Sequence, residues 1–253
     1  METLKCDHLP ADLAPLLQSA RLDGSVAVQA RSTLEETEWL LQLADQNTFI
    51  EGVVGWVDLC SPDARGQLES LSVHKRLCGV RYIVQSEPAD RSTLRPDFRR
   101  GVGLLAEFGL VCDILAFPHH LPGAYELVAA FPNQAFVLDH VAKPFVKDRV
   151  IAPWDADVRR LASLPNVYCK VSGLVTEADW KSWKPADFFP YLDVVFEAFG
   201  PRRIMFGSDW PVCTLAGSYA QVASLVEEYA RGLSGAESAE VWGETAARVY
   251  HLE

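Results

Sequence analysis

One repeated pattern dominates the sequence from residue 25 onward. A short apolar run is followed by a turn and then by a stretch whose apolar residues recur at helical spacing. Successive runs begin 25 to 36 residues apart, which is the length of one strand–helix unit. Several runs are rich in Val and Ile on both faces, as buried parallel strands are, so the pattern predicts an α/β protein. The seven runs are Ser25–Ala30, Gly52–Asp58, Gly79–Gln85, Leu110–Phe117, Ala135–His140, Val167–Val171 and Arg203–Gly207.

The stretches between the runs have the features of amphipathic helices. A helix is predicted at Ala11–Ala20, ahead of the first run. Ser32 and Glu35 have the spacing of a capping box, and Ser61 stands before a proline as a helix cap would. A buried helical stripe is predicted from the three- and four-residue steps between Phe188, Leu192, Val195 and Phe199.

The alternation without a long linker predicts one domain over residues 1–253, and its size suits a (β/α)₈ barrel of about 250 residues. A doubly wound sheet is the alternative, but it would usually carry a Gly-rich loop after the first strand. Ala30-Arg31-Ser32 stands there instead. Only seven strands are recognisable, so the expected fold is a TIM barrel that lacks its first strand.

Composition excludes several classes of partner. Thirty-four acidic residues against 23 basic ones give a net charge of −11, which disfavours binding to nucleic acid. No apolar run approaches the ~20 residues that span a bilayer, so no membrane association is expected. The N-terminus lacks the apolar core of a signal peptide, which predicts a cytoplasmic protein.

Polar residues stand at the ends of the apolar runs, where a barrel of parallel strands places its active site. Taken singly, each has a structural explanation, such as a helix cap or a core ion pair. Together they indicate a hydrolytic site, in which Asp209 and His140 activate water. Arg81 or Lys143 would hold a substrate carboxylate or stabilise an oxyanion, and Gln85 shares a strand face with Arg81. The full set of candidates is Trp56, Arg81, Gln85, His119, His140, Lys143, Asp209 and Trp210.

Several of these residues lie in segments that resemble a known family. Phe136–Pro144, Tyr168–Leu174 and Arg203–Pro211 resemble the sixth, seventh and eighth strands of the amidohydrolase-related barrels, also called amidohydrolase family 2. Three further segments resemble the third, fourth and fifth strands of these barrels: Val53–Leu59, Gly79–Arg81 and Pro118–Pro122. The resemblance extends from about Leu9 to the end of the chain.

Within that family the chain is most similar to L-fuconolactonase, L-rhamnonolactonase and 2-pyrone-4,6-dicarboxylate lactonase. The resemblance implies a metal-dependent-hydrolase barrel that opens the lactone ring of a sugar acid or a dicarboxylate, in carbohydrate metabolism. By position, Asp209 matches the catalytic aspartate, and His119 and His140 match histidines that line the site. We expect Trp56, Arg81, Gln85, Lys143 and Trp210 to contact the small-molecule substrate.

The chain departs from the family at its start. Relatives open with a strand that ends in His-x-His, whereas this sequence has no His-x-His and only the lone His8 near its N-terminus. A metal site would therefore keep at most His119, His140 and Asp209. The resemblance implies either one divalent metal, such as zinc, or none, because both cases occur among relatives. Two alternatives stay open: a decarboxylase of the same family, and a catalytically inactive truncated form. A homo-oligomer is compatible with the sequence.

Overall fold

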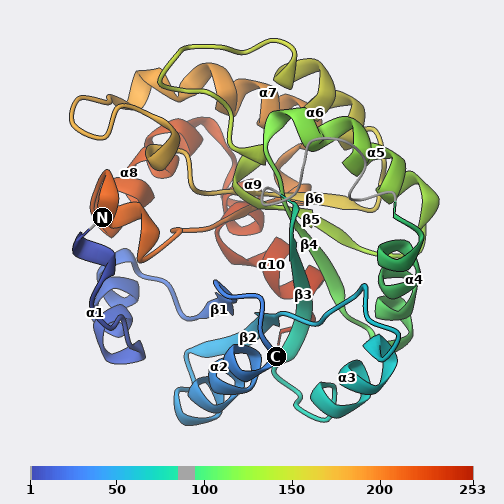
Figure 1. Ribbon diagram of the computed structural model, residues 1–253. Coiled ribbons are helices and arrows are strands. Elements are labelled where there is room, and N and C mark those ends of the chain that lie inside the picture. Colours follow the sequence, from blue (N-terminus) through green and yellow to red (C-terminus); the bar gives the residue numbers. More distant parts are fainter. Residues whose placement is uncertain (1, 85–94, 253) are drawn as a thin grey trace.

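The computed structural model describes residues 2–84 and 95–252, and within them it contains one parallel sheet of seven strands. The strands lie in chain order, from β1 to β7, and the sheet curls so that helices cover its outer face (Figure 1). The predicted α/β architecture with seven strands is confirmed. The strands are β1 (Ser25–Val28), β2 (Ile50–Gly55), β3 (Leu77–Ile83), β4 (Val111–Leu115), β5 (Phe136–Leu138), β6 (Val167–Val171) and β7 (Ile204–Phe206).

The helices alternate with the strands, as predicted from the apolar spacing. They are α1 (Pro10–Ala20), α2 (Leu34–Gln46), α3 (Ala64–Leu71), α4 (Pro96–Leu105), α5 (Leu121–Ala130), α6 (Trp154–Ala162), α7 (Phe189–Phe199), α8 (Tyr219–Tyr229), α9 (Gly235–Ala239) and α10 (Thr245–Tyr250). No helix in the described ranges is long and apolar enough to cross a bilayer.

Two predicted helix caps are wrong in position. The α2 cap is Thr33, whose hydroxyl accepts the Glu36 N–H at 3.2 Å, one residue later than predicted. The shift arises because the Glu36 carboxylate reaches back and accepts the N–H groups of Ala30 and Arg31. Ser61 accepts the Asp63 N–H at 3.0 Å in the turn before α3, and therefore does not cap that helix.

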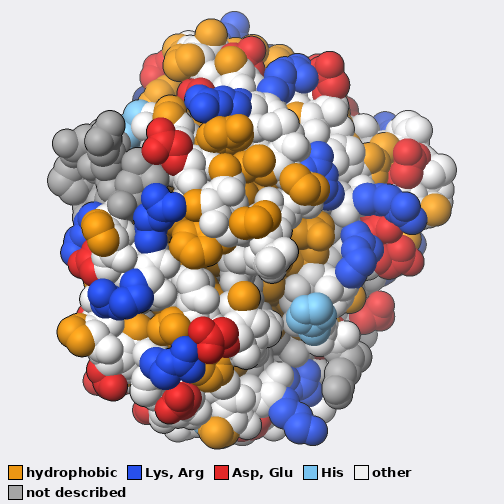
Figure 2. All heavy atoms as spheres, turned by 90° about the vertical axis from the view of Figure 1, so that its right-hand side faces the viewer, with side chains coloured by type: hydrophobic (Ala, Val, Ile, Leu, Met, Phe, Trp, Pro, Cys, Tyr) orange, Lys and Arg blue, Asp and Glu red, His pale blue; other side chains and the backbone are white. Residues whose placement is uncertain are grey.

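The outer face of the sheet carries the main hydrophobic core. The predicted stripe on α7 is buried along its whole length, from Phe188 to Phe199. At the surface, ion pairs link neighbouring helices, such as Arg65 with Glu107 at 2.8 Å. Over the face that holds α3–α5, acidic and basic side chains are intermixed with hydrophobic ones (Figure 2). Exposed pairs of this kind contribute little to stability, so the buried stripe decides how the helices pack.

The inner face of the sheet is filled in layers. The register places inward-pointing residues of neighbouring strands side by side, as with Arg81 and Asp113. Nearest the amino ends of the strands lies an apolar layer, formed by Val54, Val111, Val137 and Met205 with Val249 and Tyr250 of α10. The next inward positions towards the carboxyl ends are charged. The helix α10 therefore covers the inner face of the sheet at the amino ends of the strands. Polar residues occupy the inner face towards the carboxyl ends.

The sheet is not closed within the described parts of the chain. β1 pairs only with β2, and β7 pairs only with β6. Each of these two strands therefore has one edge without a strand partner among the residues described.

Candidate active site

Three neighbouring strands bring their polar ends together. His140 follows β5, Ser172 follows β6 and Asp209 follows β7. His140 Nε2 lies 3.7 Å from Asp209 Oδ1, and His140 Nδ1 lies 2.8 Å from the Ser172 hydroxyl. The two residues predicted to be catalytic are thus neighbours, with Ser172 holding the far side of the imidazole.

The backbone around this pair is unusual. His140, Val141, Ala142 and Lys143 all have positive φ, between 47° and 59°, and make one turn of left-handed helix. Non-glycine residues rarely adopt this conformation, and such strain clusters at functional sites. Gly173 permits the approach from β6, because a Cβ there would lie 2.7 Å from the His140 ring.

Burial controls the charge of His140. Its side chain is only 12% exposed, and burial lowers the pKa of the imidazole although Asp209 and Asp139 act to raise it. A lowered pKa keeps the ring neutral at pH 7, with one nitrogen donating and the other accepting. A neutral imidazole beside an accessible carboxylate can polarise a carbonyl group while the carboxylate takes a proton.

A buried charged layer lies beneath the pair. Lys170 Nζ contacts Asp113 at 2.5 Å and Asp139 at 2.9 Å, and Arg81 donates to Asp139 at 3.1 Å. The Tyr250 hydroxyl completes the layer at 2.7 Å from Asp113. Burial acts to raise the pKa of Asp139, but Lys170 and Arg81 outweigh it and hold that pKa below its usual range. Every carboxylate in this layer is therefore paired with a cation.

Arg81 belongs to this layer and not to the open site. It is 9% exposed, and its guanidinium donates both to Asp139 and to the Gln29 carbonyl oxygen. A guanidinium already paired in this way has little capacity left for a substrate carboxylate. The geometry does not favour the predicted role of Arg81 in holding a substrate carboxylate.

Three further residues of the site were not predicted. Asp113 interrupts an apolar strand, and this interruption was the available signal in the sequence. Tyr250 comes from the last helix, and no local pattern connects it to β4. Glu177 lies in the loop after β6, where its carboxylate stands 3.7 Å from Lys143 Nζ. Burial and the charge of Asp209 raise the pKa of Glu177, which indicates that its carboxylate lies near that of Asp209.

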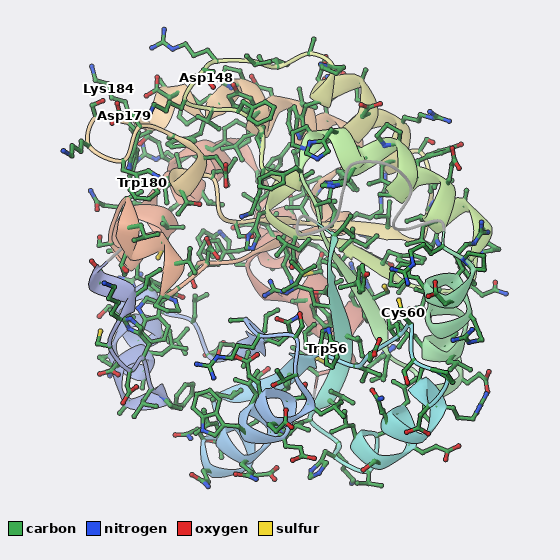
Figure 3. The ribbon with its side chains drawn as sticks, viewed as in Figure 1. Trp56, Cys60, Asp148, Asp179, Trp180 and Lys184 are labelled. Carbon is green, nitrogen blue, oxygen red and sulfur yellow. The ribbon has the colours of Figure 1, made fainter. Side chains whose placement is uncertain are left out.

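The described contacts of three other predicted residues are with neighbours outside the catalytic pair. His119 is exposed, and its ring stacks on Phe117 with centroids 5.9 Å apart. Trp210 packs edge-on against His8 at 5.3 Å, which brings the N-terminal segment to the loop after β7. Trp56 follows β2, where its N–H and C=O both bind the Thr37 hydroxyl. In the view of Figure 3 it lies far from the loops that carry Trp180.

Gln85, the remaining predicted residue, lies outside the described residues.

The predicted metal set is not assembled in the described ranges. His140 and Asp209 lie together, but no third His, Cys, Asp or Glu there completes a group that could hold a metal ion. A catalytic zinc ion usually has three protein ligands. The residues described therefore do not form a complete metal site.

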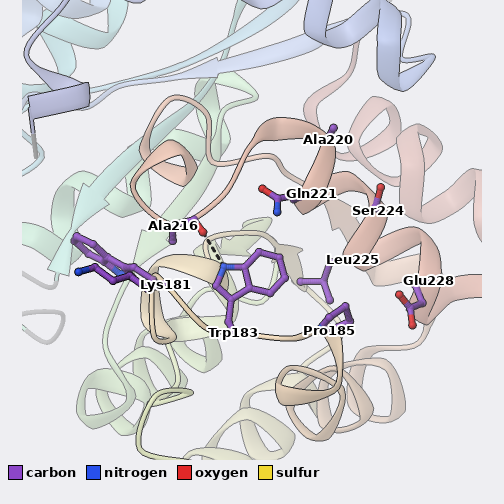
Figure 4. A pocket seen from close by; sticks show the side chains of 10 residues that line it. Lys181, Trp183, Pro185, Ala216, Ala220, Gln221, Ser224, Leu225 and Glu228 are labelled. Carbon is purple, nitrogen blue, oxygen red and sulfur yellow. Dashed lines mark hydrogen bonds between the residues drawn. The ribbon is translucent and has the colours of Figure 1, made fainter.

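A hollow of about 530 Å³ lies between the loop after β6 and α8 (Figure 4). Trp183 lines it and is fixed by a 2.7 Å hydrogen bond from Nε1 to the Ala216 carbonyl oxygen. The described residues that line it include neither His140 nor Asp209. This hollow is separate from the catalytic pair.

Comparisons with known proteins identify the family of this chain. The amidohydrolase family profile matches residues 3–252. An L-fucono-1,5-lactonase of Burkholderia multivorans is 44% identical over 263 residues, covering 100% of this chain and 88% of the relative. Another, from Burkholderia ambifaria, is 33% identical with the same coverage. A crystal structure of a Burkholderia multivorans amidohydrolase with bound zinc superposes with a TM-score of 0.96 at 44% identity, covering 100% of this chain and 92% of that one. The chain belongs to the amidohydrolase family.

Proposed function

We propose that this protein hydrolyses the lactone ring of a sugar acid. The observation that carries the proposal is the His140–Asp209 pair, with 3.7 Å between Nε2 and Oδ1, at the carboxyl ends of the strands. Relatives 44% and 33% identical over the whole chain are named L-fucono-1,5-lactonases, which supports the sugar-acid class. The substrate is a small molecule.

The reaction begins with water between substrate and carboxylate. Asp209 takes a proton from this water, whose oxygen attacks the ester carbonyl carbon. In the His140 tautomer that carries its proton on Nε2, Nδ1 accepts a hydrogen bond from the Ser172 hydroxyl 2.8 Å away, and Nε2–H stabilises the negative carbonyl oxygen. The tetrahedral intermediate then collapses, the bond to the ring oxygen breaks, and Asp209 returns its proton to that oxygen. The product is an open-chain hydroxy acid.

No step of this mechanism runs through a metal ion. Among the described residues, His140 and Asp209 fall one short of the three protein ligands that a catalytic zinc ion usually has. The charged layer below the pair supplies fixed positive groups, and its Lys170 stands between Asp113 and Asp139. We assign this layer the task of holding Asp139, and with it the start of the left-handed turn, in place.

The test is a panel of purified lactones, with release of the hydroxy acid followed by a pH indicator and by chromatography. We expect hydrolysis of at least one sugar-acid lactone. Asp209→Asn should lower its turnover by about 10²–10⁴-fold, the usual contribution of general acid–base catalysis, with an unchanged circular dichroism spectrum.

The matched control is Asp148→Asn, which neutralises an exposed carboxylate on the loop after β5. It should retain full activity. Full activity of the Asp209→Asn variant would remove Asp209 from the mechanism, and no activity on any lactone would refute the proposed function.

A further inference from the structure

Lys143 and Glu177 form an ion pair beside the catalytic residues. The proposed reaction gives this pair no role. Their charged atoms lie 3.7 Å apart, and each side chain is 20% exposed. The two loops that carry them are also joined by the backbone, because the Lys147 N–H donates to the Glu177 carbonyl oxygen at 3.0 Å. The pair is therefore held in place before any substrate binds.

The pair has unused capacity for hydrogen bonds. A separation of 3.7 Å is longer than an ordinary hydrogen bond, so the ammonium and the carboxylate do not saturate each other. An ammonium group has three N–H donors, and a carboxylate has acceptor positions on both oxygens. Adjacent hydroxyls on a sugar ring can accept from Lys143 and donate to Glu177 at once. The Phe117 ring, 5.6 Å from Lys143 Nζ, supplies an apolar wall beside them.

The charges around the site disfavour an anionic substrate. Among the residues described, the three cations of the site and of the layer beneath it all face carboxylates: Arg81 faces Asp139, Lys170 faces Asp113 and Asp139, and Lys143 faces Glu177. Asp209 adds a further negative charge. A free carboxylate on the substrate would meet Asp209 and Glu177 without an unpaired cation to offset them.

We propose that Lys143 and Glu177 are the hydroxyl-binding pair of this site, and that they select a lactone with free hydroxyls and no free carboxylate. This inference rests on the proposed lactone hydrolysis and narrows its substrate. The lactone of a monocarboxylic sugar acid is neutral, because its only carboxyl group is in the ester. The lactone of a dicarboxylic sugar acid keeps one ionised carboxylate.

The experiment compares two lactones of the same ring configuration, one from an aldonic acid and one from an aldaric acid. The unaltered protein should prefer the neutral lactone by about 100-fold in kcat/KM. Glu177→Gln should raise the KM for the neutral lactone about tenfold. It should also reduce the kcat/KM ratio of neutral to anionic lactone about tenfold, because it removes a negative charge that repels the anionic lactone. Lys143→Gln should also raise that KM but widen the preference, because it removes the neighbouring cation.

The kcat/KM ratio of neutral to anionic lactone should therefore change in opposite directions in the Glu177 and Lys143 variants. A purely structural role of the two residues would not produce opposite changes. Glu197→Gln, which neutralises a surface carboxylate paired with Arg159, should leave kcat/KM and the preference unchanged. The inference is wrong if the ratio of kcat/KM for the neutral lactone to kcat/KM for the anionic lactone is the same in both site variants as in the unaltered protein. The proposed function stands in that case, because the neutral lactone is still hydrolysed.

A protein that opens neither lactone refutes the proposed function, and binding then decides the inference. Calorimetry would compare a 1,5-anhydroalditol, which has the ring hydroxyls but no ester, with the matching anhydro-uronate. Tighter binding of the neutral ring, reduced in Glu177→Gln, supports the hydroxyl-binding pair. The hydroxyl-binding pair is refuted if both rings bind equally well, or if the unaltered protein and Glu177→Gln bind the neutral ring equally well.

Discussion

Trp154 Nε1 on α6 donates a 2.8 Å hydrogen bond to the carbonyl oxygen of Val141, the second residue of the left-handed turn. That turn places four consecutive non-glycine residues at positive φ, from His140 to Lys143, at a cost of about 1–2 kcal/mol each. The indole is 2% exposed, so the bond is shielded from water. Trp154 therefore fixes the segment that carries both His140 and Lys143.

Trp154→Phe keeps most of the ring but removes this donor. The Val141 carbonyl would lose its partner, and an unsatisfied buried group costs about 1–3 kcal/mol. We expect urea unfolding to show this loss of stability, and kcat to fall about tenfold or more because His140 is no longer held at its working distance. Trp39→Phe, at an exposed indole on α2, should change neither quantity. Unchanged kcat in Trp154→Phe would show that packing alone holds the turn.

Ala142→Gly tests the strain directly. Ala142 has φ of 59°, a region that glycine adopts without a steric penalty. The variant should therefore be as stable as the unaltered protein or more stable, while a looser turn lowers kcat. Ala220→Gly on α8 is the control, since glycine in an exposed helix costs about 1 kcal/mol and should not affect activity. A parallel fall of stability and kcat in Ala142→Gly would contradict the strain argument.

The fold was predictable because its signal is repeated. Each of the seven runs overlaps one observed strand, and the differences lie at the ends: β2 and β3 begin at Ile50 and Leu77, two residues before the predicted runs. The errors are local: the α2 cap moved from Ser32 to Thr33 because one carboxylate, that of Glu36, accepts two N–H groups. Such competition between neighbouring hydrogen bonds is decided by geometry that spacing alone does not contain.

The site was predictable where a residue ends a strand. His140 and Asp209 were expected together and lie together, because parallel strands bring their carboxyl ends to one rim. The contact between Tyr250 and Asp113 spans 137 positions in the chain, and no local pattern predicts it. Arg81 pairs with Asp139, which directly follows β5, and this contact across 58 positions of the chain is not visible in the spacing of either segment.

The charged layer should make stability depend on pH. Burial raises the pKa of Asp113 from 3.8 to about 6, with the charge of Asp139 acting in the same direction and Lys170 opposing it. The folded state therefore binds this proton more tightly than the unfolded state. The contribution of Asp113 to stability is full below about pH 4 and is lost as the pH rises through about 6.

Urea unfolding from pH 4.5 to 7.5 would measure this effect. His140 contributes with the opposite sign, since its pKa is lowered, so the informative quantity is the difference between the unaltered protein and Asp113→Asn. We expect that the free energy of unfolding of the unaltered protein, relative to the variant, declines as the pH rises across this range. If the difference in the free energy of unfolding between the two proteins did not change with pH, the pKa of Asp113 would lie outside the range from pH 4.5 to 7.5.

The edges of β1 and β7 that have no strand partner among the described residues lead to the last prediction. Edge strands present free backbone N–H and C=O groups, which favour aggregation when exposed. We therefore expect the 253-residue chain to scatter more light on heating as its concentration is raised. It should also lose added zinc during dialysis, because no third His, Cys, Asp or Glu among the described residues joins His140 and Asp209, whereas a catalytic zinc ion usually has three protein ligands. Light scattering during heating and metal analysis after dialysis would measure the two effects. Stoichiometric zinc that is retained through dialysis would contradict the prediction and require further ligands from within this sequence.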